Sequence, residues 1–482
     1  MSINKTIITK TTINGEQMQL SRIRNKFSII FTVLSLSCLA GCSWMREADL
    51  PPINQPSNFR SATSNTVVES LPYLAWWQQL NDTQLNRFIE SSLANNLDIQ
   101  VALANLEQAK GQLKQIQLSW IPFVNLYAGY SSNPAFGAPG NFYGIWPQYT
   151  LNIPSLINQQ RFAKYNLQTQ QAITDSVRLT VISEAVAGYL TLMAQQRQLE
   201  LLTTLNNDIE QLLQFESAEI KLGISDDVVF YGIKSQHETT LAQIELAKHN
   251  ITLSNNALSY LINANPSQIA NSNNFAQLSF GKINPNALPA TVLQNRPDIK
   301  IAQYQLQATH ASVGIAYSNL FPAIQLDKFM GMASGNSGRG TPNTQADMTD
   351  TYLNWGINPS TFGQIEAQKG AYQADVYHYI QTVRKAIRDT DDSLSANNHY
   401  NNNYSRINNA LTTTESKYKL QQGLYNAGMI SYPQLIKNKI EVDSMLLTTN
   451  QAKLQQALTL VKLYQELAGG YKYESQNTNT NK

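Results

Sequence analysis

Residues 143–155 read YGIWPQYTLNIPS and lead from an alternating segment into a long segment free of proline. Apolar residues at every second position predict a β-strand with one apolar and one polar face. Beyond Pro154 no proline occurs until Pro266, and apolar residues recur every three or four positions, which predicts a helix from Ser155 to Lys221. At 1.5 Å per residue this helix is about 100 Å long, far beyond an ordinary globular helix. The apolar strand positions are Tyr143, Ile145, Tyr149, Leu151 and Ile153, opposite Gly144, Gln148, Thr150 and Asn152.

The same order of elements recurs in the second half of the chain. An offset of 200 residues matches Asp98 with Asp298 and Pro122 with Pro322, and after residue 150 an offset of 205 matches Gly223 with Gly428. Each half reads helix, strand, turn, strand, long helix, tight turn, helix, which is a tandem repeat. The predicted repeats span 76–266 and 288–471, joined by a linker over 267–287. Their strands are expected at about 123–131, 143–153, 323–333 and 349–358, and their helix-hairpin tips at 222–226 and 427–431.

The N-terminus has the pattern of a secretory signal. Three basic residues from Arg22 to Lys26 precede an apolar stretch that closes on Leu39-Ala40-Gly41-Cys42. It resembles a bacterial lipoprotein signal, which implies that residues 1–41 are removed and that Cys42 carries a diacylglycerol and an N-acyl chain. A plain secretory signal with an incidental cysteine is the alternative. Residues 42–75 are then a lipidated extended segment, and residues 472–482 are a polar tail.

Composition narrows the class of protein. Only 14% of the 482 residues are charged, against about 25% in an average soluble domain. No apolar run reaches the roughly 20 residues of a spanning helix, which excludes a multi-helix membrane protein. Removal of residues 1–41 takes away five basic residues and one acidic residue, so the formal charge changes from +2 to −2 and gives a nucleic-acid partner no support. Cys42 is the one cysteine left, so the mature chain forms no internal disulfide.

Four strands of this length and alternation fit a transmembrane barrel but cannot close one. An open sheet edge in lipid leaves backbone groups unpaired at a cost of several kcal/mol each, so the chain is expected to oligomerise. Trp146, Trp355 and the tyrosines near strand ends suit an interfacial aromatic girdle. A soluble sandwich at one end of a helical rod is the alternative.

Several segments together resemble the TolC/OprM-like outer-membrane factors of tripartite efflux pumps. They are Trp76-Trp77-Gln78-Gln79-Leu80-Asn81-Asp82, Asn295-Arg296-Pro297-Asp298-Ile299, Asn319-Leu320-Phe321-Pro322, Leu424-Tyr425-Asn426-Ala427-Gly428 and Leu463-Tyr464-Gln465-Glu466-Leu467-Ala468-Gly469-Gly470-Tyr471. The resemblance implies an α+β membrane protein that forms a homotrimer. Its twelve-stranded outer-membrane barrel would continue as a periplasmic α-helical coiled-coil barrel.

The function implied by this resemblance is passive export of small molecules such as drugs. Its partners would be a periplasmic adaptor (membrane fusion) protein and an inner-membrane pump of the resistance-nodulation-division type. No catalytic motif is present in the sequence, and its five histidines share no metal-ligand spacing, so neither an enzyme nor a metal site is expected. A secretion-type export channel and a non-conducting coiled-coil lipoprotein are the alternatives.

Two groups of residues are the expected functional sites. The tips resemble surfaces that dock on the adaptor, and simple connecting turns are the alternative. Relatives often carry acids at the periplasmic entrance, where this chain has Gln434 and Lys437, so we expect a channel less selective for cations. Asp226 and Asp227 could replace the missing acids or could simply cap a helix. The expected tip residues are Leu222, Gly223, Ile224, Ser225, Ala427, Gly428, Met429 and Ile430, and the expected entrance residues are Asp226, Asp227, Pro433, Gln434 and Lys437.

Overall fold

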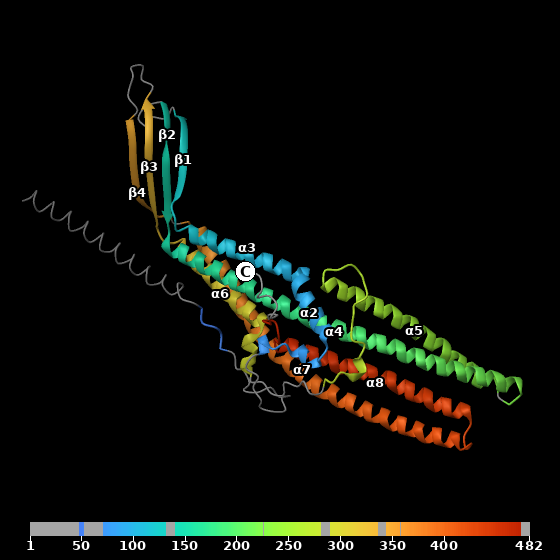
Figure 1. Cartoon of the computed structure of the whole chain (residues 1–482). Coiled ribbons are helices and arrows are strands. Elements are labelled where there is room, and N and C mark those ends of the chain that lie inside the picture. Colours follow the sequence, from blue (N-terminus) through green and yellow to red (C-terminus); the bar gives the residue numbers. More distant parts are fainter. Residues whose placement is uncertain are drawn as a thin grey trace, which may run out of the picture. The chain divides into compact units, whose positions relative to one another are not determined.

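The computed structural model describes residues 48–52, 71–131, 140–224, 226–280, 290–335, 344–356 and 358–473. The signal, Cys42, Ser225 and the tail beyond residue 473 lie outside the described residues. The first half contains η2 (Leu71–Tyr73), η3 (Trp76–Leu80), α2 (Thr83–Asn95), α3 (Leu97–Leu118), β1 (Phe123–Ser131), β2 (Gly140–Leu151), α4 (Ile153–Lys221), α5 (Asp227–Leu261) and η5 (Phe275–Gln277). The second half contains η6 (Ala290–Asn295), α6 (Pro297–Ser318), β3 (Ala323–Gly335), β4 (Thr344–Asn354), α7 (Ser360–Asn426) and α8 (Tyr432–Glu466) (Figure 1).

The chain forms two compact units, and each unit takes residues from both halves. One unit contains the sheet with the adjoining helix ends, drawn mainly from residues 108–168 and 303–378. The other is drawn from residues 52–107, 169–302 and 379–482. The two repeats of the sequence are therefore not the two spatial units, because the long helices α4 and α7 each contribute to both.

The four strands form one antiparallel sheet in the order β1-β2-β3-β4 (Figure 1). Paired residues point to the same face of a sheet. Leu126 pairs with Ile145, and Ile145 with Met330, so one face is mainly apolar; Asp347, which pairs with Met330, and Lys328 also lie on it. Gln148 pairs with Asp327, and Asp327 with Asp350, so the other face is polar.

Two expected strands differ from the observed ones at both ends. β2 spans Gly140–Leu151 rather than 143–153, and β4 spans Thr344–Asn354 rather than 349–358. Helix capping sets the C-terminal limit of β2, where Oδ1 of Asn152 accepts a hydrogen bond from Ser155 N (3.1 Å). Beyond the end of β4, Oδ1 of Asn358 accepts one from Ser360 N (3.0 Å) at the start of α7. Each asparagine thus satisfies an otherwise unpaired helix amide, and α4 begins earlier than expected, at Ile153.

The expected girdle position of Trp146 is wrong. Trp146 lies on the polar face, where its ring centroid is 5.3 Å from that of Tyr127 and 6.0 Å from that of Phe329. Gly144 and Gly331, which are paired in the register, leave room for the Phe329 ring: a Cβ on Gly144 would lie 3.0 Å from it. Trp146 has the even parity of Gln148, so the strand period itself places it away from the apolar face.

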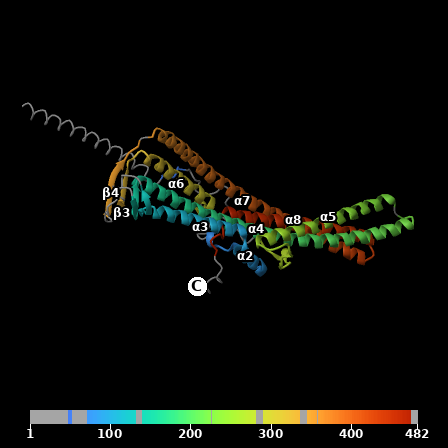
Figure 2. The ribbon, with the colours of Figure 1, turned by 90° about the horizontal axis from the view of Figure 1, so that it is seen from above.

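The long helices pack as hairpins: α5 returns along the end of α4, and α8 along the end of α7 (Figures 1 and 2). Apolar side chains spaced by three and four residues are buried in one cluster, which includes Leu205, Ile209 and Leu212 of α4, Ile233 of α5, and Ile436 and Ile440 of α8. Burial of each side chain of this kind stabilises the fold by about 1.5–3 kcal/mol. α4 also contains a window that by length and composition could cross a membrane, but 61% of that window is buried against the protein.

Contacts between the two ends of the chain complete the second unit. The ring of Trp76 stacks on that of Tyr464 with centroids 4.6 Å apart. Nη1 of Arg296 donates to the backbone oxygen of Glu466 at 2.7 Å and to its carboxylate at 2.6 Å, and Nη2 donates to Asp298 at 2.7 Å. Segments that carried the family resemblance thus fix where α6 begins and α8 ends.

Candidate functional site

The two hairpin tips have the same backbone structure. Gly223 (φ +72°) and Gly428 (φ +74°) adopt the left-handed conformation that side chains with a Cβ disfavour. Gly223 N donates to Ile220 O, and Ile224 N to Glu219 O, each at 2.9 Å. Gly428 N and Met429 N make the equivalent bonds, to Tyr425 O and Leu424 O. These paired bonds form a Schellman motif, which ends each helix and satisfies its last carbonyls.

Apolar side chains project from both tips into solvent. Leu222 is 73% exposed, Ile224 is 70% exposed and Met429 is 72% exposed. Ala427 is exposed as well, and Ile430 is half-buried. Several large apolar groups at two turns form an apolar surface that lacks a partner within the described chain.

The helices that follow the tips begin differently. Oδ1 of Asp226 accepts a hydrogen bond from Val229 N at 3.1 Å and caps α5, and the exposed Asp227 stands in the first turn. Ser431 makes no side-chain capping bond to α8, and the buried Pro433 stands at its start, where a missing amide donor costs nothing. Asp226 therefore has the capping role that its position in the sequence also allowed.

The expected entrance residues on α8 differ in their surroundings. Gln434 is exposed to solvent. Nζ of Lys437 lies 3.3 Å from the carboxylate of Glu216 on α4, whose side chain is 4% exposed. The positive charge at Lys437 is therefore balanced within its own chain, a pairing that the sequence analysis did not include.

One helical turn further along α8 lies a group of charges that the sequence analysis missed. Nζ of Lys439 is 2.8 Å from the carboxylate of Asp208 on α4. Asp443 of α8 is buried beside them, and burial together with a hydrogen bond to Asp208 raises the pKa of Asp443 to about 7. At neutral pH much of the Asp443 population is protonated and can share its proton with the Asp208 carboxylate.

A signal for these acids was present in the sequence. Asp443 follows Ile436 and Ile440 with spacings of four and three, which continues the apolar stripe of α8. Glu216 likewise follows Leu212 by four residues on the stripe of α4. An acid at a stripe position is expected to be buried and therefore to have a partner. The tip turns and this layer of paired charges together form the candidate site.

Comparison with known proteins identifies a family for most of the chain. A family model described as outer membrane efflux protein matches residues 88–264 and 288–469. The chain is 24% identical over 471 residues to the probable outer membrane lipoprotein SilC of Salmonella typhimurium, covering 92% of this chain and 98% of the relative. It is 25% identical over 465 residues to the solvent efflux pump outer membrane protein SrpC of Pseudomonas putida, covering 91% and 97%.

The fold is also found among solved structures. The Campylobacter jejuni CmeC outer membrane channel superposes with a TM-score of 0.77 at 18% identity, covering 88% of this chain and 94% of that chain. The family match contains all four strands and all the long helices described above. The resemblance drawn from the sequence is therefore confirmed, and the chain belongs to the outer membrane efflux protein family.

Proposed function

We propose that three copies of the chain form a passive channel through which small molecules such as drugs leave the cell. The protein lies in the outer membrane and is the outer-membrane component of an efflux system. In the proposed assembly an inner-membrane pump of the resistance-nodulation-division type supplies the energy, and a periplasmic adaptor joins the pump to the channel. Cys42 carries the lipid anchor, as a diacylglycerol and an N-acyl chain.

The observation that carries the oligomer is the open sheet. Within the described strands, β1 pairs only with β2 and β4 pairs only with β3. In hydrocarbon the free edges would leave unpaired amides and carbonyls, each costing several kcal/mol. Pairing β4 of one copy with β1 of the next removes every edge. Two copies, with eight strands, are the minimum for a bacterial barrel, and three copies, the number that the family resemblance implies, give twelve strands and a wider channel.

The two faces of the sheet support the same assembly. Leu126 is 81% exposed and Leu353 is 69% exposed on the apolar face, where lipid would cover them. Asn125, Gln148 and Asp327 lie on the opposite face, which would line a water-filled channel. This division explains why a sheet with so much exposed apolar surface suits a membrane better than a soluble sandwich.

The tips suit a second docking event. Leu222, Ile224 and Met429 present apolar surface without a partner in the described chain. The glycines of the two turns carry no side chains, so the helix ends of an adaptor could approach the backbone closely. In this proposal the charges behind the tips, rather than the tips themselves, set the electrostatics of the entrance.

The channel is tested by conductance. The purified lipoprotein should migrate as a trimer by native mass measurement and should give single-channel currents in a planar lipid bilayer. Trimers that give no current in repeated preparations would favour the non-conducting coiled-coil lipoprotein. A stable single subunit in detergent would contradict the assembly itself. Mass spectrometry of the N-terminal peptide tests acylation of Cys42 separately.

Ion selectivity tests the role of the entrance. We expect the wild-type channel to be weakly cation-selective, because Lys437 is paired with Glu216. Glu216→Gln leaves Lys437 uncompensated and should shift the reversal potential toward anions. Lys437→Gln should shift it toward cations. Strong cation selectivity that is lost in a double Asp226→Asn and Asp227→Asn variant would instead make those acids the filter.

A further inference from the structure

A buried glutamine of α6 binds a segment near the N-terminal end of the described chain. Nε2 of Gln307 donates to Ala48 O at 2.8 Å, and Oε1 of Gln307 accepts from Ala48 N at 3.0 Å. Gln307 is 8% exposed and Ala48 is 9% exposed. One residue far away in the sequence therefore satisfies both polar atoms of a buried amide, in a place where an unmade hydrogen bond is costly.

Helix α7 also lies beside this segment. Burial raises the pKa of the Tyr372 phenol on α7, and the charge of the nearby Asp49 raises it further. The ring of Tyr372 in turn contacts that of His310, one turn beyond Gln307 on α6, with centroids 5.4 Å apart. Residues 48–49 thus lie beside both α6 and α7, within the unit that contains the sheet.

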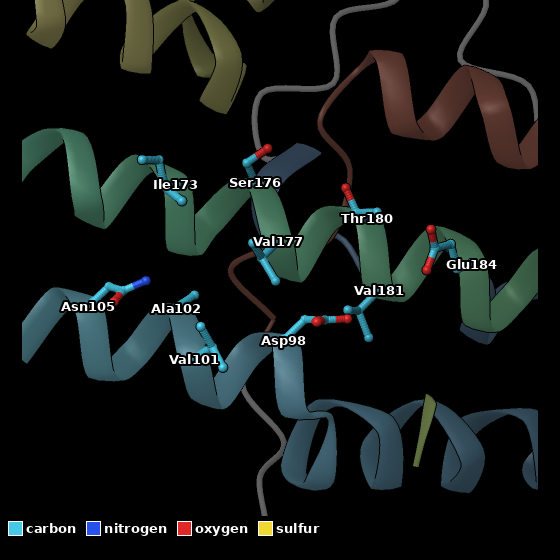
Figure 3. A pocket seen from close by; sticks show the side chains of 10 residues that line it. All are labelled: Asp98, Val101, Ala102, Asn105, Ile173, Ser176, Val177, Thr180, Val181 and Glu184. Carbon is cyan, nitrogen blue, oxygen red and sulfur yellow. The ribbon is translucent and has the colours of Figure 1, made fainter. Parts of the chain in front are cut away.

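The first repeat has no equivalent of this contact. Glu107 of α3 matches Gln307 at the offset of 200 residues and is exposed. An ionised carboxylate has no donor for a backbone carbonyl, so Glu107 could not make the same pair of bonds. Between α3 and α4 lies an open groove of about 410 Å³, and no third described segment lines it (Figure 3). The contact at Gln307 is therefore specific to the second repeat.

The length of α6 gives the distance from this contact to the proposed membrane surface. Ser318 ends α6 eleven positions after Gln307. Trp355 stands directly after β4, and its Nε1 donates to Leu320 O at 3.1 Å. Aromatic side chains at the ends of barrel strands mark the membrane–water interface. At 1.5 Å per helical residue, this interface lies about 16–20 Å from Gln307 along α6.

The segment from Cys42 to Ala48, the tether, is just long enough to reach that interface. It covers six residue steps, and an extended chain spans at most about 3.3–3.6 Å per step, or about 20–22 Å in total. The acyl chains of a lipidated Cys42 lie in the membrane. Nearly the whole length of the tether is therefore needed while Gln307 holds Ala48.

We propose that Gln307 is the site at which the protein binds its own lipid tether. One end of the tether is held in the periplasmic leaflet by the lipid on Cys42, and the other end is held by the two hydrogen bonds at Ala48. With both ends attached, the tether limits how far α6 can stand from the membrane surface. This inference rests on the proposed acylation of Cys42 and assigns the residue that receives the anchored segment.

Amide hydrogen exchange of the lipoprotein in lipid nanodiscs tests the contact. Gln307→Glu keeps the shape of the side chain but removes the donor to Ala48 O, so we expect the Ala48 amide to exchange about tenfold faster, as for one lost buried hydrogen bond. Gln305→Glu makes the same change at an exposed position of α6 and should leave the exchange of Ala48 unchanged. Equal exchange of Ala48 in the wild type and in Gln307→Glu would overturn the inference.

The length of the tether tests the attachment at both ends. Deletion of residues 45–47 keeps Ser43 and Trp44 next to Cys42 but halves the reach, so in nanodiscs the Ala48 amide should lose its protection. Replacement of the same residues by Gly-Ser-Gly keeps the length and should keep the protection. In detergent, where the lipid can follow the protein, the deletion variant should regain it.

Two results would contradict different claims. Protection of Ala48 that survives the deletion in nanodiscs would overturn the tether as a fully used link between Gln307 and the membrane. An N-terminal peptide whose mass shows no acyl group on Cys42 would instead contradict the lipid anchor of the proposed function.

Discussion

At the scale of single residues, the acids behind the tips differ, because one carboxylate is paired with a lysine and the other is buried with a raised pKa. Lys439 compensates Asp208, while Asp443 is buried beside them with its pKa raised to about 7. Burial by itself would lower the pKa of Lys439, but its hydrogen bond to Asp208 and the negative charge of Asp208 raise it. A buried carboxyl that shares a proton with a carboxylate resists ionisation because two negative charges at contact distance repel. This part of the chain is therefore sensitive to pH near neutrality.

Asp443→Asn should remove a pH-dependent part of the stability. Because the folded pKa of Asp443 is raised, its contribution is fully present below the unfolded value near 3.8 and is lost as the pH rises through about 7. Thermal unfolding measured between pH 4.5 and 8 should show a decline in the wild type that is shallower in the variant. An identical decline in both proteins would show that Asp443 does not titrate in this range.

Gly428→Ala should destabilise the second tip. The residue has φ +74°, where a Cβ costs about 1–2 kcal/mol. Gly232→Ala, in α5 with open space around it, is the control and should stabilise its helix by about 0.5–1 kcal/mol. Amide hydrogen exchange at residues 424–430 should rise only in the first variant. Unchanged exchange there would mean that the left-handed conformation of Gly428 does not stabilise the turn.

At the scale of elements, the two helix hairpins end their first helices in the same way but begin their second helices with different residues. Both long helices end in a Schellman motif at a glycine. The returning helices differ, because α5 is capped by the Asp226 side chain and α8 begins with Pro433. One helix gains a bonded amide and the other has one fewer amide to satisfy. The two tips therefore have the same backbone geometry, but only α5 depends on a capping side chain.

Asp226→Ala and Ser431→Ala separate these two solutions. Removal of the Asp226 cap should cost about 1 kcal/mol and increase hydrogen exchange at Val229 and its neighbours. Ser431→Ala should leave the first turn of α8 unchanged, because the Ser431 side chain makes no capping bond. A comparable loss in both variants would contradict the difference between the two helix starts.

At the scale of the whole molecule, the proposed assembly depends on the surfaces that one chain leaves uncovered. Within the described residues the sheet ends in two unpaired edges, and the tips expose apolar groups. In the proposed assembly another copy pairs with the sheet edges, and an adaptor covers the tips. The second unit, by contrast, is held within the chain by Arg296 at the joint between α6 and α8.

Arg296→Ala should destabilise the fold strongly. The side chain is 9% exposed and bonds both Glu466 and Asp298. Its removal leaves the buried Glu466 carboxylate with Lys462 alone, at 2.6 Å, and should cost about 1.5–3 kcal/mol for each charged hydrogen bond that is lost. Arg388→Ala removes an exposed pair and should not change the melting temperature. Thermal unfolding followed by helical circular dichroism compares the two variants. Equal melting temperatures would contradict a structural role for Arg296.

Much of the architecture could be predicted from local pattern. The period of two from Tyr143 to Leu151, the three-and-four spacing along α4, and the glycines at 223 and 428 each depend on neighbours in the sequence, where backbone sterics act directly. The position of Trp146 followed from the same period once every residue was counted. Strand ends were less predictable because Asn152 and Asn358 cap helices with side chains that a strand would also tolerate.

The sequence by itself determined the family, the tandem repeat, the long helices and the two-faced sheet, because periodicity and turn chemistry are local properties of the chain. Only the tertiary structure decided that Lys437 is paired with Glu216 and that Asp208 and Asp443 share a buried site. Those facts depend on residues about 200 positions apart. Their meeting depends on how α4 packs against α8 and α6, and the sum of many small contacts along those helices sets that packing.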